Sequence, residues 1–286
     1  MKCLSGVHEI VDSYDGFVLD LWGVVHNGKK PYPGVLDCLK QLKVAGKKIV
    51  FLSNAPRRAW AVAERIAKMG INPDYYDEIV SSGEETHAHL QLRNHPFYQK
   101  LGRKCYHIGT EKDASLFEDQ DIEIVSSLQE ADFILATDLI HSDDEPAQYQ
   151  DILNEGIRLK LPMICANPDH VVHIQGHLQY CSGALAHLYE GLGGVVKYHG
   201  KPFPEIYESV KQNFPPHARL LAVGDSFLTD VAGAHHAGLD VAFIGGGIHS
   251  DDLKIHYGEL PSHAAMKQLS QHYHINPTYV FPGLIW

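Results

Sequence analysis

Residues 17–25, FVLDLWGVV, contain an apolar run that stops at a single acid, Asp20, and a turn signal at Gly23. A short apolar run of this kind is typical of a strand buried in a parallel sheet. Gly23 and Gly28 favour a tight loop after the strand. The stretch therefore predicts a buried strand with one carboxylate at its carboxyl end, where a catalytic nucleophile could lie.

Outward from this strand, further apolar runs alternate with helical patterns. Residues 35–47 and 58–70 have the spacing of amphipathic helices, and the second ends at Gly70, a common helix terminator. Strands are predicted at 47–54, 104–110, 121–125, 132–138, 162–167 and 220–224, and a helix from about Thr229 to Ala237. This order predicts an α/β fold with a Rossmann-like parallel sheet covered by helices. Ligands of such sheets bind beyond the carboxyl ends of the strands, where Asp20 and Ser53 fall.

Composition narrows the class of protein. The chain has 286 residues, enough for one or two domains, and a formal charge of −11, which argues against a nucleic-acid partner. Its longest apolar runs are too short for a membrane-spanning helix, and its first residues lack the pattern of a secretory signal. The five scattered cysteines form no Cys-x-x-Cys pair. Reduced thiols and a cytoplasmic location are therefore expected.

Polar residues in four short stretches follow predicted strands or lie in loops, in a fixed order along the chain. They are Asp20, Ser53, Lys201 in GKP, and the pair Asp225 and Asp230 in VGDSFLTD. Each residue alone has an ordinary explanation, such as a helix cap, a turn or a solvated loop lysine. The ordered set resembles the four motifs of the haloacid dehalogenase (HAD) superfamily of hydrolases, and the resemblance covers roughly residues 15 to 250.

The middle of the chain refines this resemblance. Residues 164–190, ICANPDHVVHIQGHLQYCSGALAHLYE, followed by GKP, are similar to the class IIA, NagD-like branch. That branch carries a large α/β cap domain between the second and third motifs. The resemblance thus implies a HAD core domain over residues 1–80 and 196–286, with an inserted cap domain over residues 81–195.

The resemblance also implies a reaction and a cofactor. Asp20 would attack phosphorus and form an aspartyl-phosphate, which water then hydrolyses. Because both reactants are anionic, a divalent cation should bridge them, and Mg²⁺ suits a site made of oxygen ligands. The family pattern supplies Asp20, the backbone carbonyl of Trp22 and Asp225 as metal ligands. Asp230 would stand behind them and orient waters or the lysine.

The remaining site residues are expected to contact the substrate. Ser53 and the backbone amides that follow it, beginning with Asn54, would hold a phosphoryl oxygen. Lys201 would offset the negative charge of the phosphate and of Asp20, most strongly in the transition state. Asn167, in the Asn-Pro-Asp turn of the cap, is expected to face the site, although such a turn also occurs between strands for purely structural reasons.

Position 22 departs from the pattern of the superfamily. Its phosphatases usually have a second aspartate there, which protonates the leaving oxygen and then deprotonates the attacking water. General acid–base help of this kind is typically worth about 10²–10⁴ in rate. The indole of Trp22 cannot supply it, since its N–H is a donor without usable acidity. The metal ligand at this position is a backbone carbonyl, so Trp22 puts only the proton transfer in question.

Three hypotheses follow from Trp22. The preferred one is a magnesium-dependent phosphatase of small phosphorylated metabolites. It would be slow, act on substrates with good leaving groups, or take the proton from another residue such as His26, for which a structural role in the loop is the ordinary explanation. The second is a hydrolase of another bond, although retained Asp225 and Asp230 argue for a metal that the dehalogenases do not need. The third is a non-catalytic protein that binds a phosphorylated metabolite, with the indole as a stacking surface.

Two other segments carry weaker expectations. The run DHVVHIQGHLQY alternates apolar and polar residues around Gly176, which predicts a hairpin with solvated histidines rather than a zinc site. The final residues, TYVFPGLIW, are apolar for a terminus. They are expected either to dock on the core or to be buried in a partner subunit, and the second possibility makes a homodimer one expectation.

Overall fold

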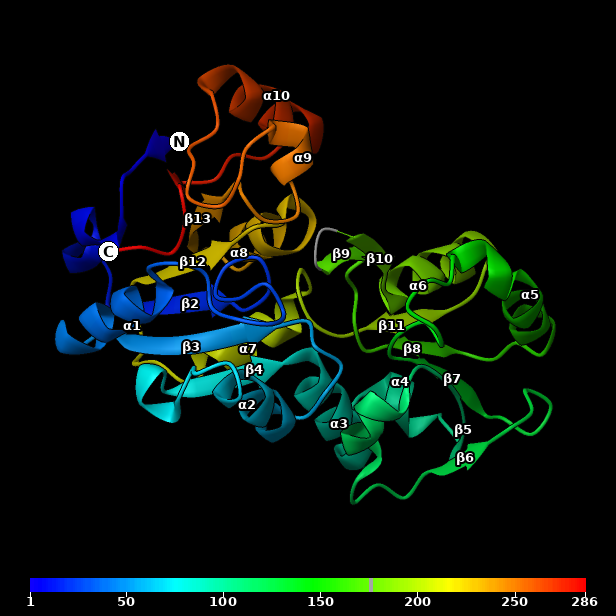
Figure 1. The fold of residues 1–286 in the computed structure, drawn as a ribbon. Helices are drawn as coiled ribbons and strands as arrows, with labels where there is room; N and C mark the ends of the chain where they lie inside the picture. Colours follow the sequence, from blue (N-terminus) through cyan, green and yellow to red (C-terminus); the bar gives the residue numbers. More distant parts are fainter. Residues whose placement is uncertain (175–176) are drawn as a thin grey trace.

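The computed structural model describes residues 1–174 and 177–286, which contain two parallel sheets and one small hairpin. The larger sheet has seven strands in the order β1 (Lys2–Cys3), β14 (Tyr279–Phe281), β13 (Asp240–Ile244), β12 (Leu220–Gly224), β2 (Gly16–Asp20), β3 (Lys48–Ser53) and β4 (Glu78–Ser81). The smaller sheet has five, β11 (Val196–Tyr198), β8 (Met163–Cys165), β7 (Phe133–Ala136), β5 (Lys104–Ile108) and β6 (Glu123–Val125). Figure 1 shows the two sheets side by side, with both termini next to the larger one.

Helices cover both faces of the larger sheet, and two separate apolar clusters fill the spaces between. One face packs against α1 (Val35–Val44) and α2 (Ala59–Ala67), and the other against α7 (Pro204–Lys211), α8 (Ala232–His236) and α10 (His263–Tyr273). The central strands β2 and β12 are buried along their whole length. This double burial explains why they have uninterrupted apolar runs. The predicted α/β fold with a parallel sheet is confirmed.

The smaller sheet is also covered on both faces, by α5 (Gln150–Arg158) and α6 (Ser182–Gly191) on one and by α3 (Ser82–Leu92), α4 (Pro96–Gln99) and the 3-10 turn η4 (Glu111–Phe117) on the other. Its edge strand β11 pairs with β8 and begins at residue 196. The smaller sheet therefore extends three residues past the predicted limit of 195, because the chain completes this strand before it returns to the larger sheet. Division into a core domain and a cap domain stays a prediction.

The hairpin formed by β9 (Val171–Ile174) and β10 (His177–Tyr180) pairs in antiparallel fashion apart from either sheet. Its strands lie where the alternation of apolar and polar residues predicted them. Gly176, at which the bend was predicted, lies outside the described residues. The hairpin matters for function because it reaches toward the carboxyl edge of the larger sheet.

The apolar end of the chain docks on the larger sheet. Tyr279–Phe281 form strand β14 between β1 and β13, and the side chains of Phe281 and Leu284 are fully buried. This segment therefore docks on the core, which was the first of the two alternatives. The expectation of a homodimer was based on the second alternative and loses that support. In the part of the chain that the structure describes, no helix has the length and apolar character needed to cross a membrane.

Candidate active site

A cavity of about 800 Å³ opens at the carboxyl edge of the larger sheet, between that edge and the β9–β10 hairpin. The eight residues to which the resemblance gave a place in the site all line it: Asp20, Trp22, Ser53, Asn54, Asn167, Lys201, Asp225 and Asp230. The parallel register brings the strand ends together, since β2 lies between β3 and β12. Strands β2 and β3 end with the polar side chains of Asp20 and Ser53, and Asp225 directly follows β12. The volume of the cavity is in the range that holds a small-molecule ligand.

An ion-paired lysine occupies the floor of this cavity. Lys201 Nζ lies 2.6 Å from Asp20 Oδ1 and 2.7 Å from Asp230 Oδ1, and all three side chains are buried. Burial alone would lower the pKa of Lys201, but the charges of Asp20 and Asp230 outweigh it and hold that pKa well above its usual range. Lys201 is therefore a permanent cation beside the Asp20 carboxylate.

Asp225 and Asp230 come from the end of β12 and from the π-helical turn η6 (Phe227–Val231) that precedes α8. The predicted helix from Thr229 thus begins as a wider turn, a geometry common at functional sites. Asp230 Oδ2 accepts hydrogen bonds from the backbone N–H groups of Asp225 and Ser226, at 3.2 and 3.1 Å. Both oxygens of Asp230 are therefore engaged, one by Lys201 and one by the backbone.

The donor set fits a divalent cation. One oxygen each from Asp20, Asp225 and Asp230 lies within 4.8 Å of the others, all buried. Burial, together with the repulsion from neighbouring carboxylates, raises the pKa of Asp20 and Asp225. When all three carboxyl groups are ionised, they and the ammonium group of Lys201 leave two negative charges, which a divalent cation would balance. Gly23 keeps this space open, because a Cβ there would lie 2.0 Å from Asp225 Oδ2.

Asn54 joins the two sheets at the site. Its Oδ1 accepts a hydrogen bond from the backbone N–H of Lys201 at 2.7 Å, and its Nδ2 donates to Lys201 O at 3.0 Å. The same Nδ2 donates to Asp169 Oδ1 at 2.9 Å, and Asp169 belongs to the Asn-Pro-Asp turn beside the smaller sheet. The side chain of Asn54 therefore positions Lys201, and the predicted contact with a phosphoryl group is left to its backbone N–H.

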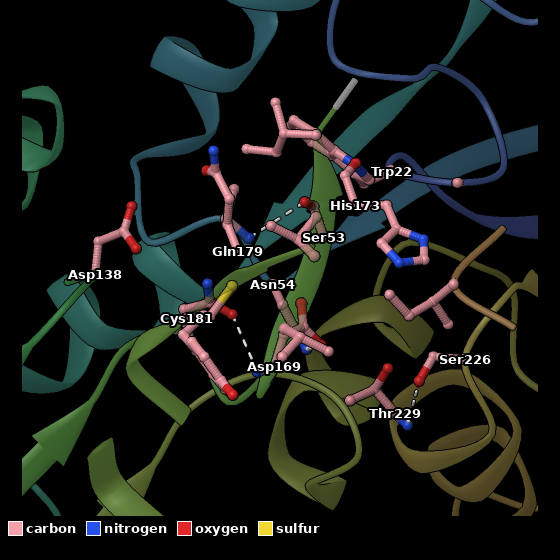
Figure 2. A pocket seen from close by; sticks show the side chains of 18 of the residues that line it. Trp22, Ser53, Asn54, Asp138, Asp169, His173, Gln179, Cys181, Ser226 and Thr229 are labelled. Atoms are coloured by element: carbon pink, nitrogen blue, oxygen red, sulfur yellow. Dashed lines mark hydrogen bonds between the residues drawn. The ribbon is translucent and has the colours of Figure 1, made fainter. Parts of the chain in front are cut away.

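Trp22 connects the same loop to the hairpin. Its indole Nε1 donates a hydrogen bond to His173 O in β9 at 3.0 Å, and Arg65 lies 5.4 Å from the centre of its ring. The ring lies against Gly28, where a Cβ would come within 2.5 Å of it. In Figure 2 Trp22 and His173 meet at one end of the cavity, with Ser226 and Thr229 at the other. Trp22 thus lines the cavity and joins the loop after β2 to the hairpin.

Comparison with known proteins gives the family. Residues 17–123 match the family described as haloacid dehalogenase-like hydrolase, and residues 198–285 match one described as HAD-hydrolase-like. A solved haloacid dehalogenase-like hydrolase from Brucella suis is 31% identical, with a TM-score of 0.83 over 99% of this chain and 100% of that one. The chain belongs to the haloacid dehalogenase superfamily. A solved structure described as a putative nagD protein is 24% identical, with a TM-score of 0.66 over 83% of this chain and 90% of that one, and this likeness is one of fold.

Two further HAD relatives are phosphatases by name. The 4-nitrophenylphosphatase of Schizosaccharomyces pombe is 26% identical over 81% of this chain and 83% of its own. The glycerol phosphate phosphatase of Mycobacterium tuberculosis, solved with magnesium, is 21% identical with a TM-score of 0.66, over 95% of this chain and 75% of that one. The second likeness is one of fold. This HAD chain is thus related to phosphatases over most of its length.

His26 does not fit the role of substitute acid in this HAD site. It is 3% exposed and is absent from the described residues that line the cavity. Its Nδ1 accepts a hydrogen bond from the backbone N–H of Gly28 at 3.0 Å. Burial, with a smaller contribution from Arg65, lowers the pKa of His26 to about 4, so the ring is neutral near pH 7. His26 is therefore better explained as a histidine that holds the loop after β2.

The sequence analysis gave no role to three carboxylates among the described residues that line the HAD cavity, Asp138, Asp143 and Asp169. Asp169 closes the Asn-Pro-Asp turn and binds Asn54, as described above. Asp138 follows β7 at the carboxyl edge of the smaller sheet, and burial raises its pKa to about 6. The signal that marked Asp20, an acid at the end of an apolar strand, was present for Asp138 in DFILATD. Only its distance from the other motifs kept it from being recognised.

The buried side chain of Lys201 makes a testable contribution to the stability of the protein. We expect Lys201→Met to lower the free energy of unfolding by about 3–5 kcal/mol in metal-free buffer, because Asp20 and Asp230 lose their buried partner. Urea unfolding measures the change. Lys197→Met is the matched control, since Lys197 pairs with the half-exposed Glu205 at 2.9 Å and should cost less than about 1 kcal/mol. Equal losses of unfolding free energy in the two variants would contradict the assignment of Lys201 as the buried partner of Asp20 and Asp230.

Proposed function

We propose that the protein is a magnesium-dependent phosphatase of small phosphorylated metabolites that uses Asp20 as its nucleophile. The observation that carries the proposal is the pairing of Lys201 Nζ with Asp20 Oδ1 at 2.6 Å, on the floor of a cavity of about 800 Å³. A buried carboxylate held by a permanent cation, at the carboxyl edge of a HAD sheet, is placed to attack an anionic substrate. Phosphatase names among the relatives support this choice.

In the first half of the reaction, an oxygen of Asp20 attacks phosphorus, and the bond from phosphorus to the leaving oxygen breaks. The leaving group departs as an alkoxide, which takes its proton from water because Trp22 supplies none, and phosphate stays bound to Asp20 as an acyl-phosphate. Ser53 Oγ and the backbone N–H of Asn54 are proposed to hold phosphoryl oxygens, and Asn167 to contact the rest of the substrate. Lys201 stabilises the negative charge that develops on the transferred group.

In the second half, water attacks phosphorus, which releases inorganic phosphate and restores the Asp20 carboxylate. Mg²⁺ would be held by Asp20, Asp225 and the backbone carbonyl of Trp22, and when bound it offsets the charge of the carboxylates and the phosphate. Asp230, engaged by Lys201 and the backbone, keeps the lysine in place. The hairpin fastened by Trp22 keeps bulk water away from the acyl-phosphate.

A panel of phosphate monoesters, incubated with the protein and Mg²⁺, tests the proposal through the release of inorganic phosphate. We expect hydrolysis of at least one small monoester, and loss of that activity when Mg²⁺ is chelated. Binding of a monoester without release of phosphate would replace the proposal with the non-catalytic alternative. A cytoplasmic location and the absence of nucleic-acid and membrane partners stay predictions from composition.

Metal should also change how stability depends on pH. The folded-state pKa of Asp20 and Asp225 is raised, so their contribution to stability is complete below the unfolded carboxyl pKa of about 4 and is lost as the pH rises. We therefore expect the Tm of metal-free protein to fall as the pH rises from about 5 to about 8, and Mg²⁺ to restore it.

Thermal unfolding across this pH range, with and without Mg²⁺, measures the effect. Asp225→Asn removes one of the repelling charges and should flatten the profile and weaken the response to Mg²⁺. A Tm near pH 8 that does not respond to Mg²⁺ in the wild-type protein would argue against a cation at these carboxylates.

A further inference from the structure

A second group of ligand-type side chains lies away from the Asp20 cavity. Glu85 and His89 are one turn apart on α3, and His199 directly follows β11. One ligand atom from each lies within 4.8 Å of the other two. Glu85 Oε2 is 3.5 Å from His199 Nδ1, and the ring centres of His89 and His199 are 5.0 Å apart. Three donors from two distant parts of the chain thus converge on one point.

His199 has a buried ring nitrogen at this point that is unpaired within the part of the chain that the structure describes. Its side chain is 1% exposed, yet among the described residues Nδ1 has no hydrogen-bond partner. A buried polar nitrogen without a partner is costly, and few persist in folded proteins. The other ring nitrogen, Nε2, is hydrogen bonded to the hydroxyl of the buried Tyr98. If Nε2–H donates to that hydroxyl, Nδ1 presents its lone pair to the Glu85 carboxylate, a repulsive contact that a cation would reverse.

We propose that Glu85, His89 and His199 form a binding site for a transition metal of the zinc class. Two imidazoles and one carboxylate are ligands that zinc accepts and that Mg²⁺ does not favour. Zinc bonds of about 2.0–2.2 Å in a tetrahedron separate neighbouring ligand atoms by roughly 3.3–3.6 Å. The distance of 3.5 Å between Glu85 Oε2 and His199 Nδ1 already matches this separation.

The residues around Glu85, His89 and His199 orient these side chains, as outer groups orient the ligands of known metal sites. Tyr98 fixes the ring of His199 through Nε2, which leaves Nδ1 for the metal. The backbone N–H of Gly200 donates to Glu85 Oε2 at 2.9 Å and fixes the carboxylate. His89 is stacked on the ring of Tyr98 with centres 5.2 Å apart. Each of the three ligands is therefore held before any metal arrives.

The position of the site gives it a structural role. The chain leaves the larger sheet after β4 and enters α3, and it returns from β11 through His199 to Lys201. Figure 1 shows α3 between the two sheets. A metal bound by Glu85, His89 and His199 ties these two crossing segments together. It would limit movement of the smaller sheet over the cavity without touching the Asp20 carboxylate.

Cobalt(II), a spectroscopic substitute for zinc, tests the site in saturating Mg²⁺, which occupies the carboxylates of the other site. We expect the wild-type protein to take up Co²⁺ with a visible absorption of low-coordinate cobalt, and Zn²⁺ to displace it. His89→Asn should weaken this binding by more than about 100-fold, since loss of groups behind a ligand already costs 10–100-fold. His8→Asn, at an exposed histidine, is the control and should bind as the wild type does.

His89→Cys separates a lost ligand from a misfolded protein. A cysteine at this position should keep the site and add a thiolate-to-cobalt absorption band that the wild type lacks. The proposal is overturned if His89→Asn binds Co²⁺ as tightly as the wild type, or if His89→Cys gives no thiolate band. Because these readouts need no turnover, they stand or fall separately from the phosphatase proposal.

Discussion

Asp20→Asn is expected to reduce the hydrolysis of phosphate monoesters by roughly 10⁴–10⁶-fold, the loss typical of removing a nucleophile. The amide keeps the size of the carboxylate but lacks the charge needed to attack phosphorus. The loss should fall on kcat, because the variant keeps Ser53 and Lys201, which we propose hold the substrate. Steady-state release of inorganic phosphate from the best substrate of the panel measures it.

A trapping experiment makes the role of Asp20 specific. Borohydride reduces an acyl-phosphate, so the wild-type protein quenched during turnover should show a reduced residue at position 20 by peptide mass spectrometry, and Asp20→Asn should not. Asp12→Asn, an exposed carboxylate in the same region of the chain, is the control and should keep full activity. Unchanged hydrolysis by Asp20→Asn would rule out the nucleophile assignment.

Trp22→Asp is expected to speed the hydrolysis of substrates with poor leaving groups by about 10²-fold or more, because the new carboxyl group can protonate the departing oxygen. Substrates such as 4-nitrophenyl phosphate need no such help, so their rate should change little. A plot of log kcat/KM against the pKa of the leaving group measures the difference. It should be steep for the wild type and shallow for the variant.

The variant also loses the hydrogen bond from the indole to His173 O. Trp22→Asn loses the same bond without gaining an acid, so the ratio of the two variants isolates proton transfer. We expect Trp22→Asp to exceed Trp22→Asn on poor leaving groups and to equal it on good ones. Equal rates for the two variants on both kinds of substrate would mean that another group already supplies the proton. Asp138 is the candidate, because its pKa is raised to about 6.

The larger sheet was predictable because its central strands are buried on both faces and therefore have uninterrupted apolar sequences. Asp20, Ser53 and Asp225 could be placed at one edge for the same reason, since parallel strands end together. The two-residue strand β1 has no pattern of its own. Residues 279–281 have an apolar character that fits docking on the core as well as burial in a partner, and only the packed structure separates the two.

The site was predictable in its members but not in its connections. Lys201 was identified through a resemblance of motifs, whereas its bonds to Asp20 and Asp230 join residues 181 and 29 positions apart. The hydrogen bond from Asn54 to Asp169 crosses between the two sheets and depends on how they are placed. The convergence of Glu85 and His89 with His199 likewise depends on the return of the chain, which the spacing of residues along one helix cannot show.

The hydrogen bond from the Trp22 indole to His173 O makes the fluorescence of this side chain sensitive to the position of the hairpin. The chain has three tryptophans, and Trp22 is the one that bridges the loop after β2 and the hairpin. The fluorescence of an indole depends on whether its N–H faces a protein carbonyl or water. Position 22 thus places an intrinsic optical probe at the mouth of the cavity, and its emission would report opening of the hairpin without any added label.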